Sequence, residues 1–143
     1  MNDNFTMKEA VELILGFCKD PQGYWKSEIE ESPEAKKFIE ARYTCFSEDN
    51  PDLYVLNSNG EVALHEYIEK ISKEFIEFMQ KQMNMRCRVD EVVEWFNQKY
   101  NLEDMKLSDE ISRYICSNLH NYGYTIADSY SSRSGSKYTL QKM

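Results

Sequence analysis

The stretch Tyr122-Gly-Tyr-Thr-Ile-Ala127, then Ser131-Ser-Arg-Ser-Gly-Ser136 and Lys137-Tyr-Thr-Leu140, decides the fold that the sequence predicts. Two runs rich in aromatic and β-branched residues on either side of a Ser/Gly segment are typical of a two-stranded hairpin. Upstream, Ile111, Tyr114, Ile115 and Leu119 keep helical spacing, and Gly123 is the residue type that ends a helix. The sequence therefore predicts a helix whose C-terminal end leads into a hairpin.

The same plan occurs earlier in the chain, between Phe38 and Leu64. A helix is expected to lead into a strand, Leu53-Tyr-Val-Leu56, a turn, Asn57-Ser-Asn-Gly60, and a second strand, Glu61-Val-Ala-Leu64. Ser32-Pro33-Glu34 predicts the start of that helix, since it combines a capping Ser, a first-turn Pro and an acid. The helix is expected to turn Ala35, Phe38, Ile39 and Phe46 inward.

Further helices are predicted around these two hairpins. Thr6-Met-Lys-Glu9 is a capping box for a helix with Ala10, Val11, Leu13, Ile14 and Phe17 on its buried face, and Pro21-Gln-Gly23 is expected to end it. Helices are also predicted from about His65 to Met83 and from Val89 to Tyr100. Tyr24-Trp25 begins a short connection. Residues 101–106 leave room for only a short helix, and Ser108-Asp-Glu-Ile111 is expected to cap the helix before the second hairpin.

The long central helix carries an apolar seam with alternating spacings of four and three residues. Its members are Leu64, Ile68, Ile71, Phe75 and Phe78. Such a seam is either a spine that packs within one chain or a homodimer interface. Periodicity does not distinguish the two, so both interpretations stand at this point.

Charge is unevenly distributed along the 143 residues, whose net charge is −8. Residues 1–87 contain 10 Lys and Arg against 17 Asp and Glu, whereas residues 88–143 contain 7 against 8. The first part of the chain should repel a polyanion such as DNA, and the second part should tolerate one. No apolar run approaches the length of a membrane span and the N-terminus is polar, so we expect a cytoplasmic protein with reduced cysteines and no membrane partner.

The two helix-and-hairpin segments resemble winged helix-turn-helix proteins. Leu53 to Leu64 is similar to the wing of MarR-like and PadR-like regulators, with Asn57 in place of the usual Thr, and residues 119–126 with 135–140 resemble a recognition helix leading into a wing. The resemblance implies a mainly α fold with small β-wings (α+β): two tandem winged-helix units, 1–83 and 88–143, joined by a long helix. Tandem winged helices bind DNA in some families and protein in others.

The best candidate for a DNA-binding site is the outward face of the second helix and hairpin. Arg113, Ser117 and His120 share one side of the helix, with Cys116 beside them and Asn121 at the margin, and no acid lies between Ile111 and Asn121. Arg133 and Lys137 flank the hairpin tip, and residues 129–143 contain three basic residues and no acid. In the first unit, Lys36 and Lys37 are additional candidates, although Glu40 lies close to them.

No catalytic motif is recognisable, and the sequence predicts neither a cofactor nor a metal site. Cys116 and His120 are four residues apart, but two ligands are too few for a structural metal centre. The chain is therefore predicted to be a non-enzymatic regulator that binds double-stranded DNA through its second unit. Its acidic first unit or its long helix would form a homodimer or bind a protein partner. The alternative is a protein-binding adaptor without nucleic-acid contact.

Overall fold

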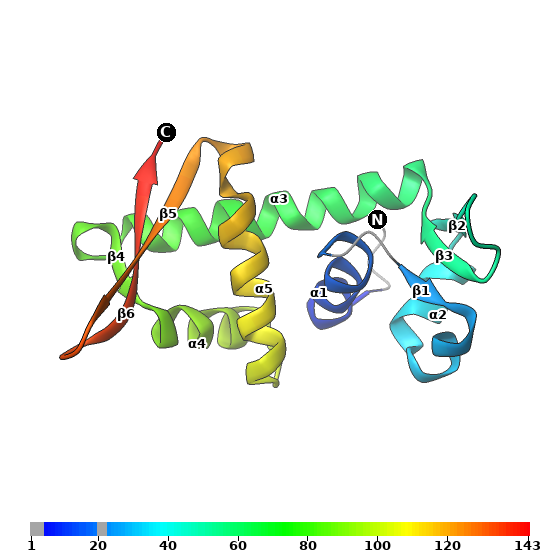
Figure 1. The fold of residues 1–143 in the computed structure, drawn as a ribbon, viewed down its shortest axis with the longest axis horizontal. Helices are drawn as coiled ribbons and strands as arrows, with labels where there is room; N and C mark the ends of the chain where they lie inside the picture. Colours follow the sequence, from blue (N-terminus) through cyan, green and yellow to red (C-terminus); the bar gives the residue numbers. More distant parts are fainter. Residues whose placement is uncertain (1–4, 20–22) are drawn as a thin grey trace. The chain divides into compact units, whose positions relative to one another are not determined.

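The computed structural model describes residues 5–19 and 23–143, which form two compact units, Met1–Ile68 and Glu69–Met143 (Figure 1). The boundary lies inside the long helix α3 (Ser58–Gln80), whereas the sequence predicted boundaries at residues 83 and 88. The C-terminal half of α3 belongs to the second unit, where Glu74 accepts a hydrogen bond from the Tyr100 hydroxyl (2.9 Å). The architecture is mostly helical with two small antiparallel sheets, which confirms the α+β class.

The first unit contains two helices, a π-helical turn, a 3-10 helix, a three-stranded sheet and the start of α3. In chain order these are α1 (Met7–Ile14), η1 (Leu15–Lys19), β1 (Tyr24–Trp25), η2 (Lys26–Glu31), α2 (Pro33–Glu40), β2 (Thr44–Phe46) and β3 (Leu53–Leu56). The sheet is antiparallel in the order β1-β3-β2. The short connection predicted at Tyr24-Trp25 is thus an edge strand followed by a 3-10 helix.

Both predicted helix starts in this unit are confirmed in position, although the Ser32 side chain makes no capping hydrogen bond. The Thr6 hydroxyl accepts from the Glu9 amide, and the Glu9 carboxylate accepts from the Thr6 amide. Pro33 opens α2, which buries Ala35 and Phe38 completely. The buried face predicted for the first helix is also confirmed, since Ala10, Val11, Leu13, Ile14 and Phe17 are all buried. Pro21 and Gln22, predicted to end that helix, lie outside the described residues.

The first hairpin is displaced along the chain from its predicted position. Its strands are β2 and β3, with Thr44 opposite Leu56, so Thr44 and Phe46 are not helical and Phe46 is 46% exposed. The predicted strand Glu61–Leu64 is instead the first part of α3. Asn57 explains this error, because its side-chain oxygen accepts from the Gly60 amide (2.9 Å) as a helix cap does.

Gly60 permits close packing at the start of α3. A Cβ atom at this position would overlap the carbonyl oxygen of Tyr43. Asn57 holds the same segment, since its amide donates to the carbonyl of Arg42 (2.8 Å). The Asn57-Ser-Asn-Gly60 segment therefore joins β3 directly to a helix and does not form the turn of a hairpin.

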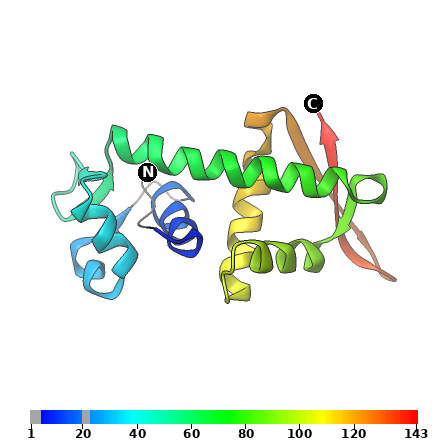
Figure 2. The same ribbon diagram turned by 180° about the vertical axis from the view of Figure 1, so that it is seen from behind.

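The second unit contains the C-terminal half of α3, two further helices and a second three-stranded sheet (Figure 2). In chain order these are α3, η3 (Met83–Met85), β4 (Arg86–Arg88), α4 (Val89–Lys99), α5 (Met105–Asn118), η4 (Leu119–Tyr122), β5 (Tyr124–Ser131) and β6 (Gly135–Lys142). The sheet order is β4-β6-β5. β5 and β6 run side by side as one long hairpin, which confirms the predicted second hairpin.

The helix before this hairpin begins one turn earlier than predicted. Asp104 caps it by accepting from the amides of Lys106 and Leu107. Ser108, the predicted cap, is buried inside α5 and donates to the Asp104 carbonyl (2.8 Å). The predicted end is confirmed, because Gly123 has φ +86° and follows the last turn, η4.

The apolar seam of α3 is largely buried within the chain. Leu64, Ile71 and Phe75 have no exposed surface, Ile68 is 8% exposed and Phe78 is only partly buried. In the second unit, the Phe75 ring centroid lies 5.2 Å from that of Phe96 and 5.8 Å from that of Trp95. A side chain without exposed surface has none left for a partner, so we interpret the seam as core.

Candidate nucleic-acid interface

The exposed face of α5 carries Arg113, which makes an ion pair within the helix. Its Nε donates to Oδ2 of Asp109 at 3.0 Å. Hydrogen bonding to Asp109, and more weakly the charge of Asp128 on β5, raises the pKa of Arg113. The prediction of an acid-free face was therefore wrong. It considered only residues 111–121, whereas α5 begins at Met105 and places Asp109 one turn before Arg113.

The other predicted residues of this face are exposed but differ in their local bonding. The Ser117 hydroxyl donates to the Tyr114 carbonyl (2.7 Å) within the helix. His120 and Asn121 lie beyond the end of α5, in η4, and both are exposed. The helical spacing that grouped these residues with Arg113 therefore changes after Asn118.

The hairpin of β5 and β6 presents the remaining predicted cations. Arg133 lies exposed at the tip between the two strands, and its amide donates to the Ser131 hydroxyl (3.2 Å). Lys137 lies opposite Ser129 on β5 and Arg88 on β4. Directly opposed residues share one face of a sheet. Within the described part of the chain, Lys137 and Arg133 make no ion pair.

Strand β4 brings two cations to this hairpin that the sequence analysis missed. Arg88 lies opposite Lys137, and Arg86 lies opposite Thr139. Both arginines are exposed, whereas Cys87 between them is buried. The alternation of Arg86-Cys87-Arg88 was the available signal, but three residues are too few to predict a strand from their pattern.

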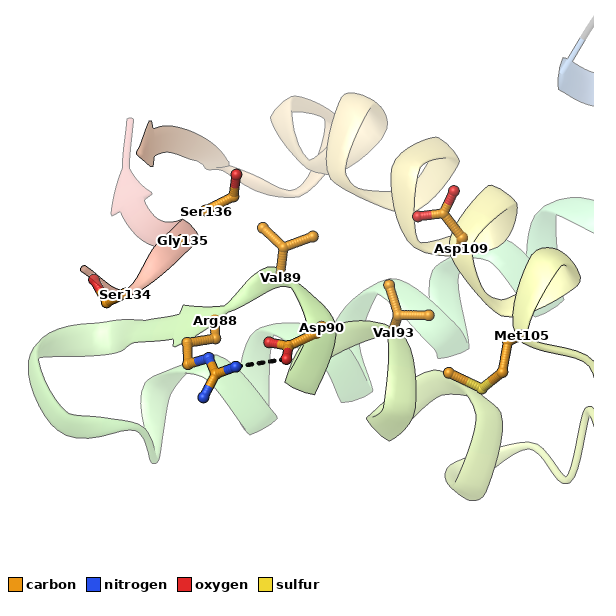
Figure 3. Close-up of a pocket in the computed structure, with 9 residues that line it drawn as sticks. All are labelled: Arg88, Val89, Asp90, Val93, Met105, Asp109, Ser134, Gly135 and Ser136. Carbon is orange, nitrogen blue, oxygen red and sulfur yellow. Dashed lines mark hydrogen bonds and ion pairs between the residues drawn. The ribbon is translucent and has the colours of Figure 1, made fainter. Parts of the chain in front are cut away.

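A pocket of about 440 Å³ connects α5 with the hairpin tip (Figure 3). Its walls come from the start of α4, the first half of α5 and the turn into β6, and its lining residues are Arg88, Val89, Asp90, Val93, Met105, Asp109 and Ser134–Ser136. Both acids in the lining are paired, Asp90 with Arg88 (2.7 Å) and Asp109 with Arg113. A ligand that covers this pocket would meet α5 and the hairpin together.

The two lysines predicted as additional contacts in the first unit are paired with acids. Lys37 Nζ lies 3.0 Å from Glu9 Oε1 and 4.8 Å from the centre of the Phe5 ring. Lys36 Nζ lies 3.9 Å from a carboxylate oxygen of Glu30. Residues 1–68 contain 6 Lys and Arg against 14 Asp and Glu, a net charge of −8, whereas residues 69–143 contain 11 of each. Unit 1 therefore carries the entire net charge of the chain.

Burial raises the pKa of three of the four cysteine thiols, whereas the fourth is exposed. Burial, with a smaller contribution from the charge of Asp128, raises the pKa of Cys116 to about 12. Burial and neighbouring acids raise the pKa of Cys18 and of Cys87 to about 11. Cys45 on β2 is exposed. In the described ranges, no group of three or more His, Cys, Asp and Glu side chains is placed to hold a metal ion.

Alkylation of the folded protein should therefore discriminate among the cysteines. At neutral pH we expect iodoacetamide to modify Cys45 first and Cys116 at least about tenfold more slowly. Only the thiolate reacts, and burial both shields Cys116 and raises its pKa. Peptide mass spectrometry over time measures the four rates, with a urea-unfolded sample as the control for intrinsic reactivity. Equal rates for Cys45 and Cys116 in the folded protein would contradict the burial described here.

No protein-family model, curated protein or solved structure matches this chain. Of the helices in the described residues, none is both long and apolar enough to cross a membrane. Function must therefore be inferred from the arrangement of this chain's own residues.

Proposed function

We propose that both units are winged-helix units and that the second binds duplex DNA, in a non-enzymatic regulator. The order of elements supports this. If η1, η3 and η4 are left out, each unit has the order helix, strand, helix, helix, strand, strand. In unit 1 the second helix is the 3-10 helix η2. In both sheets the first strand pairs with the third, and the third with the second. In this arrangement α5 takes the place of the recognition helix and β5–β6 that of the wing.

One observation carries the proposed DNA contact: an acid-free hairpin end shares a pocket with α5. Residues 129–143 contain Arg133, Lys137 and Lys142 but no Asp or Glu. Ser134–Ser136 of the hairpin and Asp109 of α5 line the same pocket (Figure 3). A duplex could therefore contact the helix face and the hairpin tip together, with Arg133 positioned to meet phosphate or the minor groove.

The ion pair on α5 limits the affinity that we expect. An exposed pair such as Arg113–Asp109 is worth at most about 1 kcal/mol, so Arg113 can exchange the carboxylate for a phosphate or a base. The Asp109 carboxylate nevertheless stays on the same face and repels the duplex. We therefore expect non-specific dissociation constants near the weak end of the usual range, on the order of 10⁻⁴ to 10⁻⁵ M at physiological salt.

Fluorescence anisotropy with a labelled mixed-sequence duplex tests this proposal. At about 20 mM salt the wild type should bind, and its affinity should fall steeply as salt rises. Arg113→Ala/Arg133→Ala should weaken binding by about tenfold and reduce the salt slope, because two proposed phosphate contacts are removed. Absence of binding at low salt would overturn the proposal.

Lys73→Ala/Lys81→Ala is the matched control for this experiment. It removes the same charge from exposed positions of α3 that are paired with Glu69 and Glu77 and belong to the same unit. Its affinity for the duplex should stay within about twofold of the wild type, because only the general field of the protein changes. Equal weakening by both double variants would show that net charge, and not the proposed surface, accounts for binding.

The second candidate function is a protein-binding adaptor, and the features of unit 1 favour it. This unit has a net charge of −8, its Lys36 and Lys37 are paired with acids, and Phe46 and Trp25 remain 46% and 38% exposed. Exposed aromatic residues are common at the centres of protein interfaces. The adaptor function predicts no duplex binding at low salt. A partner that binds through the exposed Phe46 and Trp25 should have an affinity much less sensitive to salt than a phosphate contact.

A further inference from the structure

We propose that strands β4 and β6 form a phosphate-binding pocket on the second unit, with Arg86, Arg88 and Lys137 as its cationic groups. All three line one pocket of about 280 Å³. The site lies beside the helix face and hairpin tip proposed to contact DNA. Arg88 borders both pockets, and Lys137 also belongs to the acid-free hairpin end. Its proposed ligand is a phosphate group, either free or as part of a nucleic-acid backbone.

Sheet pairing places these cations together although β4 and β6 are about 50 residues apart in the sequence. Arg88 lies directly opposite Lys137, and Arg86 lies opposite Thr139, two residues further along the same strand. The side chains of Arg86, Arg88 and Lys137 are therefore on one face of the sheet. Tyr138 and Cys87, which are opposite each other, alternate with these cations along the strands and are buried, although Cys87 also borders the pocket.

The charges of the pocket complement a phosphate dianion. Arg86 is oriented by its Nε, which donates to the Thr139 hydroxyl at 3.1 Å, so its two terminal nitrogens stay available for a bidentate contact. Lys137 makes no ion pair within the described residues. Arg88 is paired with Asp90 (2.7 Å) and more distantly with Glu91 (4.0 Å), but these exposed pairs are weak.

The lining of the pocket contains three cations and only one carboxylate, that of Glu91. Asp90 lies outside this lining but pairs with Arg88 at 2.7 Å, so the local charge is about +1. That charge is opposite to that of a phosphate monoester or an inorganic phosphate near neutral pH. Asn84 also lines the pocket and adds an amide that can donate to an oxygen. A volume of about 280 Å³ holds a phosphate group together with several waters, each of which occupies roughly 30 Å³ in the liquid.

The first test is an amide NMR titration of the full chain with inorganic phosphate, with chloride adjusted to hold the ionic strength constant. We expect saturable shifts confined to Arg86–Arg88 and Lys137–Thr139. In Arg86→Gln/Lys137→Gln the apparent affinity should fall at least about tenfold, because two of the three cations are lost. Lys73→Gln/Lys81→Gln, with the same change in charge, should titrate as the wild type does. Shifts that do not saturate, or that are equally strong elsewhere in the chain, would contradict the proposal that this pocket binds phosphate.

A second arm identifies the source of the phosphate. If the short duplex used above perturbs the same amides and competes with inorganic phosphate, the pocket binds the nucleic-acid backbone. If phosphate saturates the pocket and duplex does not compete, the pocket binds a free phosphorylated ligand. Failure of the wild type to bind duplex would refute the proposed function and leave the phosphate titration unaffected, so the two proposals can fail separately.

Discussion

Phe75→Ala is expected to lower the free energy of unfolding by about 3–5 kcal/mol, because it removes a large ring from the centre of the second unit. Phe75 has no exposed surface. Its ring lies 5.2 Å from Phe96, 5.8 Å from Trp95 and 6.3 Å from Phe78, measured between ring centroids. The neighbouring rings are held by two helices and cannot collapse fully into the space. The variant therefore loses the free energy of burying the ring and also carries the cost of the cavity left behind.

Urea denaturation followed by circular dichroism measures this loss, and Phe78→Ala is the control. Phe78 stacks on Trp95 at 4.8 Å but remains partly exposed, so its removal should cost clearly less than the removal of Phe75. Both residues belong to the apolar seam, so the comparison separates a buried position from a marginal one. Equal losses for the two variants would contradict the orientation of α3 in this unit.

Phe38→Ala is the second substitution with a large expected effect, again about 3–5 kcal/mol, in the first unit. Phe38 on α2 is fully buried, and its ring contacts come from three segments of the chain. Tyr43 lies 4.8 Å away, Phe17 5.6 Å and Phe5 5.8 Å between ring centroids. Loss of this ring removes the contacts of α2 with η1, with Phe5 ahead of α1 and with Tyr43 ahead of β2.

Phe46→Ala is the matched control, because the sequence predicted Phe38 and Phe46 on the same buried helix face. In the structure Phe46 belongs to β2 and is 46% exposed, with its ring centroid 4.6 Å from that of Tyr54 and 4.8 Å from Lys26 Nζ. Its loss should therefore cost about 1 kcal/mol or less in the same urea assay. If Phe46→Ala destabilises the protein as strongly as Phe38→Ala, residues 44–46 continue the helix and the described sheet is wrong.

The sequence predicted elements well where one local signal was sufficient. The Thr6 capping box, the Pro33 helix start, the Gly123 helix end and the β5–β6 hairpin each depend on residues close together in the chain. The predictions were wrong where a local pattern was compatible with two structures and tertiary packing determined which one forms. Gly60 suggested a hairpin turn, but the structure uses it for close approach to the Tyr43 carbonyl at the start of α3.

The candidate site was predicted only in part, for a similar physical reason. Arg133 and Lys137 are recognisable because they lie on a hairpin with a clear sequence pattern. Arg86 and Arg88 join Lys137 only through the pairing of β4 with β6, which three residues cannot signal locally. The Asp109–Arg113 pair was missed because only residues 111–121 were searched for acids, although Asp109 lies one helical turn before Arg113.

Amide NMR mapping of the full chain with a short mixed-sequence duplex at low salt tests the central proposal most directly. Shifts should concentrate at Arg113, at His120 and Asn121, and at the hairpin tip around Arg133, and they should diminish as salt is added. Lys36 and Lys37 should be unaffected, because both are paired with acids in a unit of net charge −8. Shifts centred on the first unit, or none anywhere at low salt, would contradict DNA binding through the second unit.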